Sequence, residues 1–165
     1  MALRNIRKDD EPCLSKKCRV VDKFGPSLGE LIDDMFDTMY DADGVGLAAP
    51  QVGILKRICV IDTGEKTERV ELVNPVILSS DGIQGGMEGC LSFPGRSGYV
   101  ERAEHVIVAA QDRNGEPHTY EAHGLFARAL QHELDHLDGL TYLRLVKEPP
   151  AEYLRDHPEE EEEEE

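Results

Sequence analysis

Residues 125–139 read LFARALQHELDHLDG, and their pattern predicts a helix around which the other elements pack. Apolar side chains recur along this stretch at helical spacing, at Leu125, Ala129, Leu130, Leu134 and Leu137. Gly139 follows the last of them and is placed to end the helix. We therefore expect an amphipathic helix here whose apolar stripe is buried in the core.

This helix carries His132-Glu133-Leu134-Asp135-His136, which matches the pattern H-E-x-x-H. Histidines at positions i and i+4 share one face of a helix, so both imidazoles can reach the same metal ion. Glu133 sits beside that face, where its carboxylate can hold a proton next to a water that the ion activates. The alternative interpretation is two histidines on an ordinary helix.

A third metal ligand is expected elsewhere, because a catalytic site has three protein ligands and an exchangeable position. The segment Glu88-Gly89-Cys90-Leu91-Ser92 offers Cys90. Taken alone, such a cysteine is most often a small buried hydrophobe, although Gly89 permits close approach of the backbone. A thiolate with two imidazoles would form a tetrahedral site with an open fourth position.

A third segment, GVGLAAPQVG at residues 44–53, is punctuated by glycine. Its simplest interpretation is a tight turn between a helix and a strand, and it lacks the Gly-Lys-Ser/Thr of a phosphate-binding loop. Gln51 is its residue of interest, because an uncharged side-chain amide can donate to a developing oxyanion.

The remaining sequence predicts one more helix and several strands. A helix over roughly 28–41 follows from the spacing of Leu28, Leu31, Ile32, Met35 and Met39. Ser27 and Glu30 before it have the spacing of a capping box. Strands are expected at Ile58–Asp62, Val70–Leu78, Val106–Ala110 and around Tyr120 and Ala122. The glycine-rich stretch Gly82–Gly98 is expected to be irregular and functional. Helix, strands and helix in this order predict an α+β fold with mostly antiparallel sheets around the last helix.

Composition limits the class of protein. The 165 residues suit one domain, and we expect a catalytic domain over 1–147 and an extension over 148–165. The formal charge is −16, and seven of the negative charges form the run Glu159–Glu165, which we expect to be a disordered tail. So acidic a chain is a poor general binder of DNA. No stretch suits a membrane span or a signal peptide, so we expect a cytoplasmic protein with reduced thiols.

The strings GVGLAAPQVG at 44–53, EGCLS at 88–92 and QHELDHLDG at 131–139 together resemble the peptide deformylases. Each string is complete, and the resemblance covers residues 1 to about 145. Phe93-Pro94-Gly95 and Arg128, by contrast, fall at positions of the substrate pocket where family members vary. The acidic tail lies outside the family pattern.

The resemblance implies a role for each matching position. Cys90, His132 and His136 would bind one divalent ion, with iron(II) as the expected native metal and zinc, nickel or cobalt as substitutes in purified protein. Glu133 would move the proton from water to the leaving amine. The Gln51 side chain and the Leu91 backbone N–H would stabilise the oxyanion.

The same resemblance implies the substrate. The backbones of Gly46 and Gly89 would pair with an extended peptide, and a pocket for the methionine side chain would be formed by Val45, Leu125 and Ala129. The reaction would remove the formyl group, as formate, from N-formylmethionine on nascent polypeptides. Because nascent chains are the implied substrate, we expect the ribosome, near its exit tunnel, as a candidate partner.

Two other classes of protein share parts of this pattern. An ordinary H-E-x-x-H zinc peptidase takes its third ligand downstream, where His157, Glu148 and Glu152 have no evident reason to return to the site. A structural metal module would close its site with a fourth Cys or His, yet Cys13, Cys18 and Cys59 lack the usual paired spacing. Formate release from formyl-Met peptides separates the three classes.

Overall fold

The computed structural model describes residues 2–64 and 69–158. The longer elements are α1 (Pro26–Asp41), β1 (Gly46–Ala48), β2 (Ile58–Ile61), β3 (Val70–Asp81), β4 (Gln84–Gly89), β5 (Ser97–Arg102), β6 (His105–Gln111), β7 (Pro117–His123), α2 (Gly124–Leu137) and α3 (Ala151–Asp156). Short 3-10 helices lie at Pro12–Ser15, Ala49–Val52 and Tyr142–Leu145.

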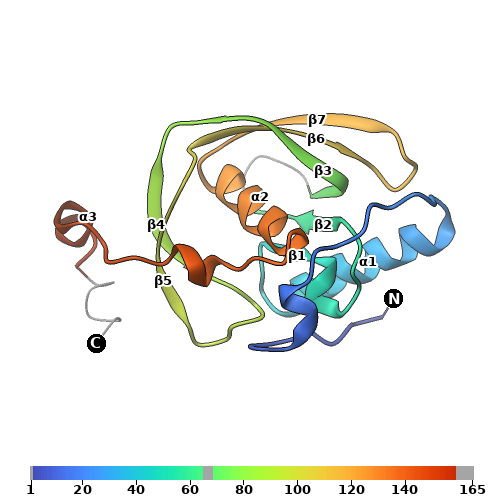
Figure 1. Cartoon of the computed structure of the whole chain (residues 1–165), viewed down its shortest axis with the longest axis horizontal. Coiled ribbons are helices and arrows are strands. Elements are labelled where there is room, and N and C mark those ends of the chain that lie inside the picture. Colours follow the sequence, from blue (N-terminus) through green and yellow to red (C-terminus); the bar gives the residue numbers. More distant parts are fainter. Residues whose placement is uncertain (1, 65–68, 159–165) are drawn as a thin grey trace.

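Five strands form one sheet in the order β1-β2-β3-β6-β7, and β4 and β5 form a second. Neighbouring strands in both sheets run antiparallel. Figure 1 shows α2 near the centre, with β6 and β7 above it, β4 and β5 to its left and β1 and β2 to its right. The expected α+β fold, with antiparallel sheets around the motif-bearing helix, is confirmed.

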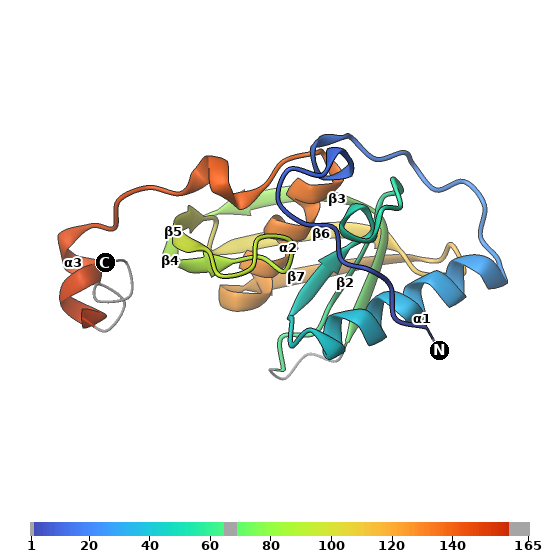
Figure 2. The same ribbon diagram turned by 90° about the horizontal axis from the view of Figure 1, so that it is seen from below.

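Strand β2 explains how two helices share one sheet. Its four residues are all buried, as their continuous apolar sequence suggests. Cys59 and Ile61 pack in the core cluster that contains the α2 stripe, whereas Ile58 and Val60 pack in the cluster under α1. Because side chains alternate between faces along a strand, β2 lies between the two helices, as Figure 2 shows.

Both predicted helices are present, and one detail of their ends was wrong. Helix α1 begins at Pro26 after Gly25, which makes no side-chain cap, so Ser27 lies inside the helix and the capping box is not formed. Proline suits the first position of a helix, because a backbone N–H at that position has no partner within the helix and proline lacks one. Helix α2 ends at Leu137, and Gly139 follows with φ 76°, the left-handed conformation that favours glycine.

The stretch Gly82–Gly98 is more regular than predicted. It contains β4 and the start of β5, and the irregular part is the turn between them. Glycine is depleted in strands, but here two glycines make room for neighbours: a Cβ at Gly85 would overlap Tyr99, and a Cβ at Gly98 would come within 2.5 Å of Val146. The segment 44–53 likewise contains a short strand and a 3-10 helix in addition to its turns.

The C-terminal extension predicted for 148–165 is described in part. Helix α3 lies within it, while the predicted disordered tail, Glu159–Glu165, lies outside the described residues. Among the residues described, no helix has the length and apolar character needed to cross a bilayer.

Candidate active site

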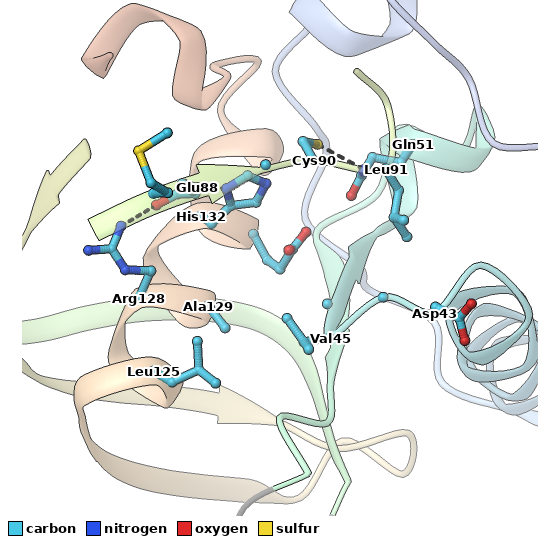
Figure 3. Close-up of a pocket in the computed structure, with 15 residues that line it drawn as sticks. Asp43, Val45, Gln51, Glu88, Cys90, Leu91, Leu125, Arg128, Ala129 and His132 are labelled. Carbon is cyan, nitrogen blue, oxygen red and sulfur yellow. Dashed lines mark hydrogen bonds and ion pairs between the residues drawn. The ribbon is translucent and has the colours of Figure 1, made fainter. Parts of the chain in front are cut away.

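The three sequence motifs meet at one pocket of about 370 Å³ between β1, the end of β4 and the inner face of α2. Figure 3 shows its lining. The segment 44–53 contributes Gly44, Val45, Gly46 and Gln51, the segment 88–92 contributes Glu88 to Leu91, and α2 contributes Leu125, Arg128, Ala129, His132 and Glu133. The fold thus brings together segments that are separated by about forty residues in the chain.

Cys90, His132 and His136 form the group that can hold a metal ion here. One donor atom from each lies within 4.8 Å of the other two. The Cys90 Sγ is 3.3 Å from His136 Nε2. Burial lowers the pKa of His136 to about 3, so this imidazole is neutral and has a lone pair to offer a metal.

A buried ion-pair network stands behind this group, and the sequence did not reveal it. The carboxylate of Glu88 accepts a hydrogen bond from His132 Nδ1. The other ring nitrogen of His132 is therefore directed toward the metal-ligand candidates Cys90 and His136. Arg102 and Arg128 donate to the same carboxylate at 2.6 and 2.7 Å. Burial alone would raise the pKa of Glu88, but the hydrogen bonds from His132 and Arg102 hold it well below its usual range. Glu88 lies two residues before Cys90, and that proximity was the signal that could have pointed to it.

Glu133 projects from α2 toward β1. Its carboxylate is buried, and Oε1 has no hydrogen-bond partner among the described residues. Burial raises the pKa of Glu133 to about 7, near the value that suits an acid–base group at neutral pH. Gly46 lets it sit there, because a Cβ at that position would lie 2.5 Å from the Glu133 Oε2.

Gln51 is held in one orientation by its surroundings. Its Oε1 accepts a hydrogen bond from the Ala48 backbone N–H at 2.9 Å. The amide nitrogen therefore points away, 3.1 Å from Ser92 Oγ and 3.5 Å from Cys90 Sγ. The Gln51 amide nitrogen thus lies beside the metal-ligand candidates, where it donates to Ser92 and to Cys90.

The remaining predicted site residues also lie in this pocket. Val45 faces Leu125 and Ala129 across its apolar end (Figure 3). Val45 and Leu125 are 43% and 42% exposed, so both side chains are accessible to a ligand in the pocket. The pocket is also lined by Gly46, Gly89 and Leu91. The structure thus gathers every predicted site residue into one place, with His136 buried behind the pocket wall.

A cysteine and two histidines beside a buried carboxylate and an oriented amide define a metal-dependent hydrolase. The chain belongs to the peptide deformylases: the family model for polypeptide deformylase matches residues 3–151.

Individual relatives agree with this assignment. A peptide deformylase of Lachnoclostridium phytofermentans is 54% identical over 147 residues, covering 88% of this chain and 90% of the relative. That of Caldicellulosiruptor bescii is 52% identical, covering 94% and 95%. Among solved structures, the peptide deformylase of Thermotoga maritima superimposes with a TM-score of 0.86 at 40% identity, covering 90% of this chain and all of that one.

Proposed function

We propose that Cys90, His132 and His136 hold one divalent metal ion and that the deformylation typical of this family takes place beside it. The reaction removes the formyl group, as formate, from the N-terminal N-formylmethionine of newly synthesised polypeptides. The observation that carries the residue assignment is the convergence of these three donors with Glu133 and Gln51 around one pocket.

The donor group fits a divalent transition metal. A thiolate and two imidazoles form a softer donor set than carboxylates would. We propose iron(II) as the native ion, with zinc, nickel or cobalt able to replace it. When bound, the ion would act as a Lewis acid toward water and the formyl carbonyl oxygen.

Each residue around the donor group then has a distinct task. Glu133 accepts a proton from the attacking water on its carboxylate and delivers it to the leaving amine. The Gln51 amide and the Leu91 backbone N–H donate to the oxygen that becomes negative in the transition state. Glu88 keeps the His132 ring in the orientation and tautomer that ligation requires.

The pocket supplies the substrate contacts. β1 is an edge strand of its sheet, so the Gly46 backbone can pair with an extended peptide, with Gly89 opposite. Val45, Leu125 and Ala129 enclose the methionine side chain. Because the substrate is a nascent chain, we place the enzyme in the cytoplasm, near the ribosomal exit tunnel.

The zinc-peptidase alternative is less well supported by the geometry. Within residues 2–64 and 69–158, the third donor beside the two helix histidines is Cys90, not a downstream glutamate or histidine. The His157 ring instead stacks on Tyr153 at 4.2 Å.

The test compares two substrates and one variant. Two activities are measured with the same preparation. One is formate release from a formyl-Met-Ala-Ser peptide, and the other is cleavage of an internal peptide bond in a peptide whose ends are blocked. We expect formate release alone. Glu133→Ala should retain the metal but lose about a hundred- to ten-thousandfold in turnover. Loss of the metal with the side chain, or cleavage of the internal peptide bond, would contradict the proposal.

A further inference from the structure

A second group of metal-ligating side chains lies on the other face of the five-stranded sheet. His105 on β6 pairs directly with Asp81 on β3 and with His123 on β7, so the three form a row across adjacent strands. Glu121 precedes His123 by two positions on β7 and therefore shares its face. The alternate residues of β6 and β7, among them Val106 and Ala122, are buried in the cluster that contains α2.

The side chains of this row converge. His105 Nε2 lies 2.7 Å from Glu121 Oε2, and the His105 and His123 rings stack with centroids 4.4 Å apart. One donor atom from each of these three residues lies within 4.8 Å of the others. On the opposite side of the His105 ring, Nδ1 lies 2.5 Å from Asp81 Oδ1.

We propose that His105, Glu121 and His123 form a second binding site, for a divalent transition-metal ion such as zinc. Two imidazoles and a carboxylate are a donor set that zinc uses in proteins. Asp81 completes the arrangement, because a carboxylate on the second nitrogen of a ligating histidine fixes its tautomer and ring orientation. Glu121 is 63% exposed and His123 is also exposed, so a water can reach the fourth position.

This site is separate from the catalytic one. None of its four residues is among those that line the pocket beside Cys90, and they project from the sheet face away from α2. The competing explanation is an ion pair of protonated His105 with both carboxylates, which accounts for Asp81 and Glu121 but not for the second imidazole stacked on the first. Zinc binding distinguishes the two.

The experiment uses enzyme whose catalytic site is loaded with nickel. Zinc chloride is added in a calorimeter, and the nickel content and formate release of the same sample report on the catalytic site independently. We expect one zinc to bind per chain with the nickel retained. Removing a partner of a ligating histidine typically weakens metal binding about ten- to a hundredfold, and His123→Ala, which removes a ligand, should weaken it at least as much.

The matched control is His118→Ala. His118 is also a partly exposed β7 histidine bonded to a carboxylate, Asp112 at 2.8 Å, but it lies outside the group. The His118→Ala protein should bind zinc with the same affinity as the parent protein. His105→Gln, close to histidine in size, provides a second variant should His123→Ala fail to fold. The proposal would be overturned if zinc bound only by displacing nickel from the catalytic site. It would also be overturned if a folded His123→Ala or His105→Gln protein bound the additional zinc as tightly as the parent.

Discussion

Nδ1 of His132 lies 2.5 Å from Oε1 of Glu88, so the orientation of a helix histidine is set by a residue on another element, β4. This contact links the motif on α2 to the strand that carries Cys90 toward the pocket. Arg102 neutralises the same carboxylate, which explains how Glu88 can remain charged while buried.

Glu88→Gln should weaken metal retention by about ten- to a hundredfold, because it replaces the charged partner of His132 and of two arginines. Competition with a chelator measures this directly. Glu101→Gln is the control, since Glu101 pairs with Lys147 at 2.7 Å and not with a donor residue. Equal metal retention in the two variants would show that Glu88 is structural only.

Gly46→Ala should lower turnover while leaving the metal in place. The new Cβ would lie 2.5 Å from Glu133 Oε2, so the carboxylate must move. Displacement of a reacting group by about 1 Å can cost roughly a hundredfold in rate. Gly29→Ala on α1, where a Cβ would meet Arg113 at an ordinary 3.6 Å, should keep full activity. A normal turnover number for Gly46→Ala would mean that Glu133 does not need its present position.

Gln51→Leu removes the amide donor while keeping similar volume. Loss of one oxyanion donor typically costs on the order of a hundred- to a thousandfold in turnover. Steady-state kinetics with a formylated peptide separates kcat from KM. A change confined to KM would make Gln51 a binding residue rather than a catalytic one.

Cys90→Ser should abolish the thiolate-to-metal band in the near ultraviolet spectrum of the cobalt(II) enzyme, together with deformylation. The same band should persist after serine replacement of Cys13, Cys18 or Cys59. Burial raises the pKa of Cys18 to about 11 and that of Cys59 well above its usual value, so these remain thiols. A normal band in Cys90→Ser would refute its assignment as a ligand.

Ending the chain after Pro158 should leave turnover nearly unchanged, because the run Glu159–Glu165 lies beyond the family match, which ends at residue 151. The assay compares kcat/KM of the two chains with one formylated peptide. A decrease greater than about tenfold, equivalent to about 1.4 kcal/mol of barrier, would show that the tail takes part in catalysis or binding.

Much of the fold could be predicted because it depends on local periodicity. The apolar stripe of α1 can be recognised over one or two helical turns, and the continuous apolar run of β2 over a few residues. Each pattern predicts burial from neighbouring residues alone. The hairpin of β4 and β5 was missed, since the glycines that argue against strands are needed to accommodate Tyr99 and Val146. Those neighbours can be identified only after the strands have paired.

The sequence by itself determined that His132 and His136 share a face and that Glu133 stands beside them, because the bonded geometry of a helix places residues four apart together. It also singled out Cys90 and Gln51 by their motifs. Only the tertiary structure decided that these segments meet, that Glu88 fixes the His132 ring, and that His105 and His123 face each other across two strands. Such contacts depend on sheet register and on packing around α2, which no local spacing specifies.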